Sequence, residues 1–305
     1  MDTLIELTEK PKTEELYMIA GWRQWADAGA ISSALPKYLA KQSKAHRIGR
    51  IKPDGFYLYQ LPGTHHFLRP EIKFEEGHRK EIRLNRNEFY YTGNERKGFV
   101  IFVGDEPHMN AERYAEAFFN AVKELGVKRV AALGGVYAVV PYDKDRQVSC
   151  TYSLLAMKDE LSQYAVRFSN YEGGVSIGSY MAHWAEVMGV EYFALYGFVP
   201  MYDFSQLSPD LQGISVENDF KAWYDLMRRL NHMFKLSLDL SDLEEQTEKL
   251  MKSMAEQIAE TERRFPQAHV REYMDKLSDD FTEMSFMPLD DVWDRELGDL
   301  FKDME

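Results

Sequence analysis

The sequence predicts an α/β protein with a largely parallel central sheet, flanking helices and a C-terminal helical extension. Three observations predict it: four apolar runs end on glycine, helical patterns separate several of them, and amphipathic helical spacing dominates the end of the chain. A chain of 305 residues that is 45% hydrophobic can bury a large core. We expect an α/β domain over residues 1–235 and an acidic amphipathic helical extension over residues 236–305.

The predicted sheet rests on apolar runs that are mostly continuous rather than alternating, as expected for strands covered on both faces. They are Leu16–Trp22, Gly98–His108, Arg129–Tyr137 and Glu191–Pro200. One helix is predicted between Asn110, a candidate N-cap, and Gly126, a candidate stop. A second is predicted from about Ser176 to Met188. This alternation of strand and helix indicates parallel strands joined by right-handed crossovers.

Two further regions have different patterns. Three short aromatic-rich segments predict antiparallel strands that are added to the sheet or form a lobe against it: Phe56–Leu61, Glu81–Arg86 and Glu88–Gly93. Near the C-terminus, Leu243, Leu250, Met254 and Ile258 predict a helix that Phe265-Pro266 ends, and Val270–Phe281 predicts another. We expect these helices to pack on the body or on a neighbouring subunit.

Charge and cysteine content exclude several classes of protein. The net charge is −13, and residues 242–305 alone hold 19 acidic and 8 basic residues, a balance of −11. Phosphate backbones would be repelled, so we expect no nucleic-acid partner. No apolar run approaches the ~20 residues of a membrane-spanning helix. With a single cysteine, Cys150, and no signal-peptide pattern at the start, we expect a cytoplasmic protein. The acidic extension is either a solvated face or a partner-docking surface.

A site is expected where the carboxyl ends of the parallel strands meet. The ligand-binding candidates there are Trp22, Asp27, Glu106, Gly134, Gly135 and Tyr137. Trp22 could equally be a core aromatic. Asp105-Glu106 could be an acid/base pair, or Glu106 could favour a helix N-terminus through its charge. The eight histidines show no ligand spacing on a helix, so we expect no metal site.

Two glycine-rich stretches could approach a ligand. Gly134-Gly135-Val136-Tyr137 lacks the lysine and hydroxyl residue of a phosphate loop, and the dinucleotide fingerprint is absent, so we expect no cofactor. These two glycines therefore indicate close passage of a packing neighbour or of a ligand. Gly173–Gly178 leads into the second helix, where it is either an anion site or an ordinary loop.

Several stretches, taken in order, resemble the proteasome assembly chaperone family of the second-chaperone type. They are Gly21–Ala30, Val103–His108, Leu133–Val148, Glu172–Glu191 and Gly197–Tyr202. The resemblance covers roughly residues 1–235, and the helical end looks like the extension of bacterial members. It implies a fold similar to purine nucleoside phosphorylases and bacterial nucleosidases, and a homo-oligomer such as a trimer. The eukaryotic members of the family help to assemble the proteasome α-ring, whereas its prokaryotic members mostly have no settled function.

The sequence departs from the family pattern at three places. Where members often have Pro-His-Thr-Arg, this chain has Pro141-Tyr142-Asp143-Lys144. Where members often have Pro-His-Tyr, it has Pro200-Met201-Tyr202. Both changes remove a histidine from the predicted site and disfavour acid/base chemistry there. The final residues, Phe301–Glu305, lack the penultimate tyrosine with which the eukaryotic chaperones insert between proteasome subunits.

Two functional hypotheses follow. The first is a non-enzymatic assembly-chaperone-like or interaction protein that binds copies of itself and, through its C-terminal helices, another protein. The alternative is a protein that binds a nucleoside- or nucleotide-like molecule, or a nucleosidase- or phosphorylase-like hydrolase, at the carboxyl edge of the sheet. The missing histidines favour the first.

Overall fold

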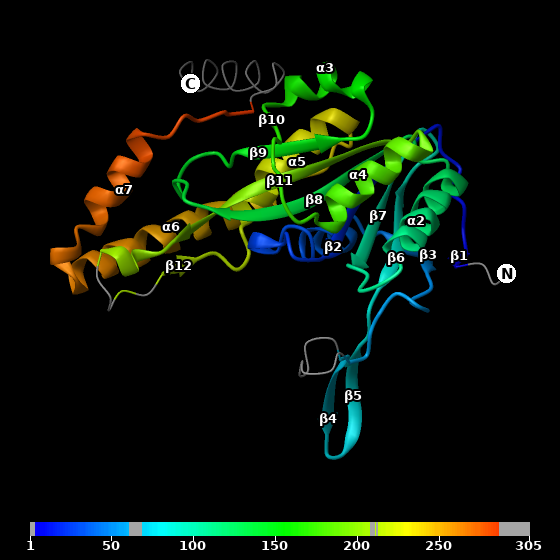
Figure 1. Ribbon diagram of the computed structural model, residues 1–305, viewed down its shortest axis with the longest axis horizontal. Helices are drawn as coiled ribbons and strands as arrows, with labels where there is room; N and C mark the ends of the chain where they lie inside the picture. Colours follow the sequence, from blue (N-terminus) through cyan, green and yellow to red (C-terminus); the bar gives the residue numbers. More distant parts are fainter. Residues whose placement is uncertain (1–3, 61–68, 208–210, 212, 287–305) are drawn as a thin grey trace, which may run out of the picture.

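The computed structural model describes residues 4–60, 69–207, 211 and 213–286, and within them a ten-stranded sheet forms the centre of the molecule (Figure 1). Nine strands follow one another across it in the order β1 (Ile5–Leu7), β3 (His46–Ile51), β6 (Asn87–Gly93), β7 (Lys97–Asp105), β2 (Glu15–Arg23), β8 (Arg129–Ala138), β11 (Glu191–Tyr202), β9 (Val148–Tyr152) and β10 (Arg167–Phe168). The tenth, β12 (Ile214–Ser215), pairs with β11.

The four strands predicted from the glycine-ended runs are the four central neighbours β7, β2, β8 and β11. They are mutually parallel as predicted, and their carboxyl ends lie at one edge. The sheet as a whole is mixed rather than largely parallel, because β1, β3, β6, β9 and β12 join it through antiparallel pairings. Ile19 on β2 pairs with both Ile101 and Ala131, and all three are fully buried. Helices cover both faces here, which is why the runs are continuously apolar.

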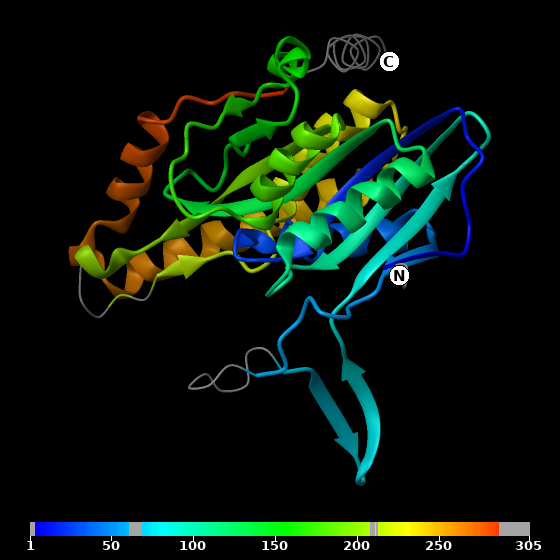
Figure 2. The same cartoon turned by 45° about the vertical axis from the view of Figure 1, so that its right-hand side comes forward.

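Successive residues of the central strands are buried in two different apolar layers, one on each face of the sheet. Figure 2 shows the helices that cover these two faces. Met18 and Ala20 pack in one layer with helices α2 (Ala111–Leu125) and α4 (Ile177–Met188). Ile19 packs in the other, which holds α1 (Leu35–Gln42), α5 (Phe220–Phe234) and α6 (Ser241–Arg264). A strand alternates its side chains between faces, so one β-strand joins both layers. A short helix, α3 (Lys158–Leu161), follows β9.

The predicted helix ends are largely confirmed. Gly126 ends α2 in a left-handed conformation, and Ser176 caps α4 by accepting a hydrogen bond from the Ser179 amide at 3.4 Å. Asn110 precedes α2 as expected, but its side chain donates to the carbonyl of Gly55 at 2.7 Å and does not cap the helix. A contact with a distant loop has replaced the local one.

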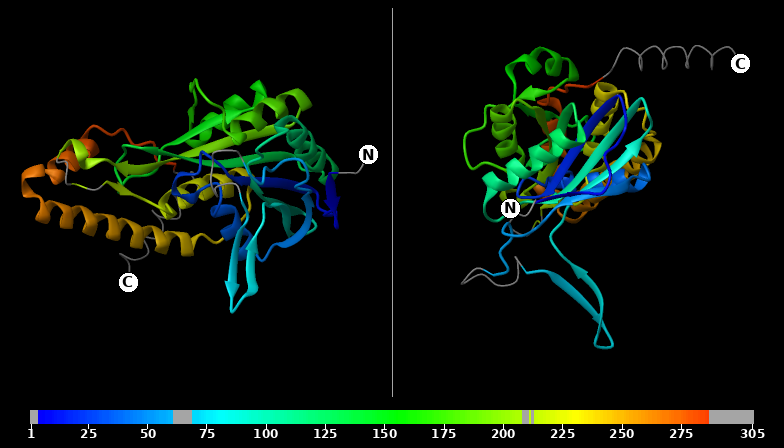
Figure 3. Two further views of the ribbon diagram at one scale, coloured as in Figure 1. Left: turned by 60° about the horizontal axis from the view of Figure 1, so that its bottom comes forward. Right: turned by 90° about the vertical axis from the view of Figure 1, so that its right-hand side faces the viewer.

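The C-terminal helices pack on the body. The helix α6 ends at Arg264 as predicted, and α7 (Val270–Asp279) follows. Leu243, Met254 and Val270 are buried in the same apolar layer as α5. Figure 3 shows α6 running beside the body and extending beyond it. Residues 287–305 of the predicted extension lie outside the described residues, and the division into two domains stays a prediction.

The antiparallel region differs from expectation in two segments. Glu88–Gly93 lies in β6, which is added to the sheet as predicted. Glu81–Arg86 begins in a separate hairpin of β4 (Glu71–Glu75) and β5 (His78–Arg83) that stands away from the sheet (Figure 1). Phe56–Gln60 forms no strand, because Phe56 is fully buried and its carbonyl accepts hydrogen bonds from the loop after β7; Leu61 lies outside the described residues.

Candidate functional site

At the carboxyl edge of the sheet, Glu106 connects three elements. It directly follows β7, and one carboxylate oxygen accepts from the Trp25 amide at 3.3 Å, in the loop after β2. The other oxygen accepts from the Ile177 amide at 3.1 Å, in the first turn of α4. A carboxylate is favoured at this positive helix end. Burial raises the pKa of Glu106, against the two hydrogen bonds that lower it.

Glu106 therefore does favour a helix N-terminus, but the helix is α4 and not α2, which follows Glu106 in the sequence. The amide of Ile177 lies within the glycine-rich stretch that the sequence offered as an anion site. It is already occupied by a carboxylate of the chain itself. In this arrangement Glu106 holds two loops together.

Asp27 organises the short turn after β2. One carboxylate oxygen accepts from the amides of Ser32 at 2.8 Å and Ser33 at 2.9 Å. Burial raises the pKa of Asp27, although these hydrogen bonds oppose the rise. The backbone of Asp27 also pairs with Gly135 as an isolated parallel bridge, so the turn extends β2 alongside β8.

Gly134 and Gly135 lie against protein atoms. A Cβ at Gly134 would stand 2.4 Å from the Tyr196 ring, and a Cβ at Gly135 would stand 2.0 Å from the carbonyl oxygen of Ala28. The amide of Gly135 also donates to the carbonyl of Ala26 at 2.9 Å. Of the two roles that the sequence left open for these glycines, the structure shows the close packing neighbour.

Trp22 lies beneath the carboxyl edge. Its side chain is fully buried, and its indole N–H donates to the Tyr114 hydroxyl at 3.0 Å. The Tyr114 hydroxyl in turn donates to the Asn87 side chain at 2.8 Å. The indole packs against the rings of Phe102 and Phe118, which also contact each other. Trp22 thus has the role of a core aromatic in this structure.

The predicted residues lie on opposite faces of the sheet. Gly134 and Val136 on β8 face α4, because Gly134 contacts Tyr196 and Tyr196 reaches α4 through Ser176. Gly135 and Tyr137 face the other way, towards Ala28. Tyr137 is 45% exposed. The structure therefore brings Asp27 and Gly135 together, and Glu106 with the start of α4, without joining all six in one site.

Exposed apolar side chains occur near the start of α4, where Glu106 binds, both in loops and at the end of β8. Trp25 is 70% exposed and is held by its amide to Glu106. We call this set the α4 patch; it comprises Trp25, Val136, Tyr171 and Val175. Contiguous exposed apolar surface is typical of sites that contact other proteins.

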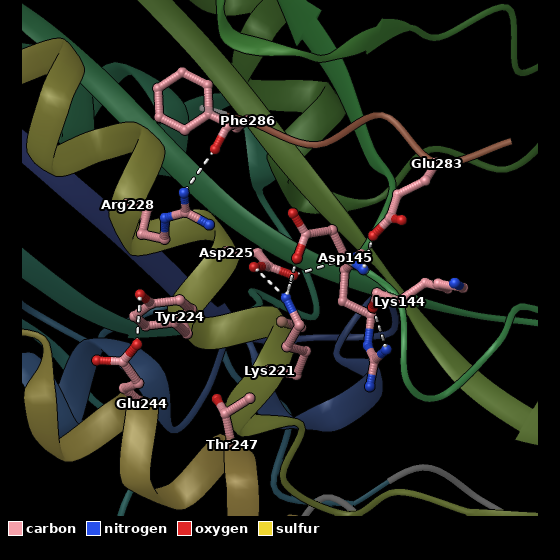
Figure 4. Close-up of polar contacts among 12 residues, drawn as sticks. Lys144, Asp145, Lys221, Tyr224, Asp225, Arg228, Glu244, Thr247, Glu283 and Phe286 are labelled. Atoms are coloured by element: carbon pink, nitrogen blue, oxygen red, sulfur yellow. Dashed lines mark hydrogen bonds and ion pairs between the residues drawn. The ribbon is translucent and has the colours of Figure 1, made fainter. Parts of the chain in front are cut away.

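A buried ion-pair cluster that the sequence did not predict lies beside this edge. Arg146, in the loop after β8, donates from Nε to Asp219 at 2.8 Å, and the two side chains are 1% and 0% exposed. Lys221 binds Asp225 at 2.7 Å and also binds Asp145 (Figure 4). Asp219 caps α5 as well, accepting from the Ala222 amide at 3.0 Å.

The charged groups of this cluster all bind other groups of the chain itself. Buried charges are tolerated only when paired and hydrogen-bonded, and here each acid has a basic partner. The one signal in the sequence was the spacing of four between Lys221, Asp225 and Arg229, which places them on one side of α5. No local sequence pattern indicated that this side of α5 would be buried against the loop after β8.

The C-terminal segment covers part of the same edge. Glu283 accepts from the Asp145 amide at 2.8 Å, and Arg228 donates to the carbonyl of Phe286 at 2.7 Å (Figure 4). Tyr273 of α7 packs edge-on to Phe204, just beyond β11. The loop after β8 and the end of β11 are therefore covered, while the α4 patch keeps its exposure.

A groove of about 710 Å³ lies elsewhere, between the β12 region and the end of α6. None of the six predicted residues lines it. Across the described parts of the chain, no three His, Cys, Asp or Glu side chains gather closely enough to hold a metal ion. Among the helices described, none is both long and apolar enough to cross a membrane.

Comparison with protein families decides the family. The sequence profile of the PAC2 family matches residues 22–258. The chain belongs to the PAC2 family. This confirms the resemblance to proteasome assembly chaperones that the order of its motifs indicated. No curated protein sequence matches the chain.

Solved structures of PAC2-like proteins share the fold. A Mycobacterium tuberculosis proteasome-assembly chaperone homologue, Rv2125, is 23% identical with a TM-score of 0.67, over 80% of this chain and 96% of its own. A Streptomyces avermitilis PAC2 family protein is 22% identical with a TM-score of 0.66, over 81% and 97%. The Pyrococcus furiosus archaeal proteasome activator PbaB is 16% identical with a TM-score of 0.56, over 83% and 97%.

Proposed function

We propose that this PAC2 protein is a non-enzymatic, assembly-chaperone-like interaction protein that acts in the cytoplasm as a homo-oligomer. Its family membership over residues 22–258 carries the proposal. The similar structures include a proteasome-assembly chaperone homologue and a proteasome activator, so the shared fold serves protein assemblies in those cases. The buried single thiol, Cys150, fits a reducing compartment.

The carboxyl edge supports an interaction role. Glu106, Asp27 and the buried ion pairs all bind groups of the chain itself, which leaves the edge rigid. The α4 patch at this edge is exposed and can contact another molecule. We propose this patch as the surface that contacts the partner protein.

No observation favours the alternative of a nucleoside-binding protein or a nucleosidase- or phosphorylase-like hydrolase. It requires the predicted residues to line one cleft, within a fold like that of the nucleoside phosphorylases. Trp22 is buried, the two glycines are packed, and Tyr137 lies on the face of β8 opposite the α4 patch.

The test is cross-linking of the full-length protein in lysate, followed by binding measurements with each purified candidate partner. Trp25→Asp together with Val175→Asp is expected to weaken partner binding by at least about tenfold, because charge is introduced into an apolar contact. The matched control is Leu155→Asp, at a site that is 83% exposed beyond β9. Equal binding by both variants would contradict the α4 patch. Thermal stabilisation by a nucleoside, abolished by Tyr137→Ala, would instead support the alternative.

A further inference from the structure

The hairpin of β4 and β5 is the most exposed ordered feature of the described chain. Every residue of both strands is exposed, and the hairpin projects from the base of β6 well clear of the sheet (Figures 1 and 3). We call residues 71–84 the arm. Its two strands pair antiparallel, with a bulge between Lys73 and Phe74.

One face of the arm is mainly apolar, with Arg79 opposite Phe74 near the turn. Ile72 lies directly opposite Ile82, and Phe74 follows two residues after Ile72 on the same face. Leu84 continues the series two residues beyond Ile82. These four side chains are between 36% and 58% exposed. No other part of the described chain covers them.

The opposite face is charged, and two ion pairs join charges within the arm. Glu71 pairs with Arg83 at 3.6 Å across the two strands. Lys73 lies directly opposite Glu81. Lys80, at the bulge, reaches Glu75 at 2.9 Å. This face is suited to water, so only the apolar face lacks a partner.

An isolated two-stranded hairpin is marginally stable in water unless its apolar face packs against something. The arm extends away from the described body, and no described part of the chain covers its apolar face (Figure 1). An amphipathic hairpin of this kind is suited to contact another protein.

We propose that the apolar face of the arm packs against a second copy of this chain, as a contact between protomers of the homo-oligomer proposed above, on which this inference rests. Charge supports this choice of partner. The arm itself holds four basic and four acidic residues, and Arg69 and Arg86 beside its base bring residues 69–86 to a balance of +2, whereas the whole chain carries −13. The basic residues at the base of the arm are therefore attracted to the acidic surface of another copy.

The size of the arm also favours a second copy. Strands of five and six residues, at ~3.4 Å per residue, are only about 17–20 Å long, and a stable interface needs about 800 Å² from each partner. A separate protein would gain one such small contact. In a symmetric oligomer each protomer gives one arm and receives one, so the contact is made twice per protomer.

The experiment compares two arm variants of the full-length protein by sedimentation equilibrium. The first replaces Ile72, Phe74 and Ile82 by threonine, which keeps strand propensity but removes the apolar face. The matched control replaces Lys73 and Glu81 by threonine on the charged face. We expect the first variant to raise the dissociation constant of the oligomer at least 100-fold, and the control to stay within about threefold of wild type.

A second measurement does not depend on the variants folding normally. In the wild-type protein, hydrogen exchange of the arm amides is expected to slow as the protein concentration is raised and to return to fast exchange on dilution. Exchange that does not depend on concentration would overturn the inference.

Failure of the inference is distinguishable from failure of the proposed function. An oligomeric wild type whose assembly is unchanged by the apolar-face variant would overturn the arm contact and leave the homo-oligomer standing. A monomeric wild type would overturn both. Loss of partner-protein binding in that variant, with assembly unchanged, would show that the arm contacts a different protein and would also overturn the inference.

Discussion

Arg146 and Asp219 lie 73 residues apart in the sequence and form an ion pair in which both side chains are withdrawn from water, with Nε and the carboxylate oxygen 2.8 Å apart. Three carbonyl oxygens of the loop after β8 also accept from the Arg146 guanidinium: those of Pro141, Tyr142 and Lys144. The pair therefore attaches that loop to the start of α5 and fixes one side of the carboxyl edge.

We expect Asp219→Ala to lower the free energy of unfolding by about 3–5 kcal/mol, because it leaves the Arg146 charge buried without its partner. Loss of the α5 cap adds to this effect. Urea denaturation measures the change. The control is Lys249→Ala, which breaks an exposed pair with Glu245 and is expected to change stability by less than about 1 kcal/mol. Similar small losses in both variants would contradict a buried, desolvated pair.

The two glycines of β8 are expected to resist substitution. Gly135→Ala places a methyl group against the Ala28 backbone, which cannot move as readily as a side chain, and should cost about 1–3 kcal/mol or more. Gly134→Ala displaces the Tyr196 ring and should also destabilise. Thermal unfolding measures both. Gly174→Ala is the control, since a Cβ there meets no described atom within 4 Å, and it should leave the midpoint unchanged.

Glu106 is expected to make stability depend on pH. Burial raises its pKa above the ordinary 4.5, so the folded state holds the proton more tightly than the unfolded chain does. Its contribution to the free energy of unfolding is therefore complete below the unfolded pKa and is lost as the pH rises through the folded pKa. Relative to Glu106→Gln, the wild type should lose stability from about pH 4 upwards.

Urea midpoints of the wild type and of Glu106→Gln across this pH range measure the effect. The variant retains one acceptor oxygen, so a constant offset from the lost hydrogen bond is expected at every pH. Glu116→Gln, at an exposed position of α2, is the control. A parallel pH dependence for the wild type and Glu106→Gln would show that Glu106 does not titrate as its burial requires.

The C-terminal helices are expected to unfold together with the body. Leu243 of α6 is fully buried in the apolar layer that also contains α5, so Leu243→Ala should cost about 2–5 kcal/mol. Leu250→Ala, at a partly buried position of the same helix, should cost less. Circular dichroism during urea unfolding measures both. Two separate transitions, with only the weaker one shifted by Leu243→Ala, would indicate an independently folding extension.

The central sheet was predictable because its signals are local. Within Arg129–Tyr137, the apolar run Val130–Leu133 leads directly into two glycines, and the structure has β8 there, beside β2 and β11. Gly126 ended its helix as predicted, and Gly189 ends α4 in the same left-handed conformation, because such a residue closes a helix through local backbone geometry. Phe56–Gln60 has a strand-like composition, yet Phe56 is drawn into the core beside Tyr114 and no strand forms.

For the candidate site, the sequence predicted the location at the carboxyl edge of the sheet but not the contacts of its residues. The carboxyl ends of the parallel strands do meet, but the sequence could not show that Trp22 would bind Tyr114 or that Gly134 would contact Tyr196. Side chains of β8 alternate between faces, so residues adjacent in the sequence were divided between two surfaces. The apolar and charged faces of the arm required the register that pairs Ile72 with Ile82.

By itself the sequence determined the four parallel strands, the helices between them, the amphipathic end and the family, because hydrophobic periodicity and helix-ending residues act over a few neighbours. Only the tertiary structure decided that Glu106 binds the start of α4, that Arg146 finds Asp219, and that the arm stands free of the sheet. Those contacts join residues tens of positions apart, and the path of the folded chain determines which groups meet.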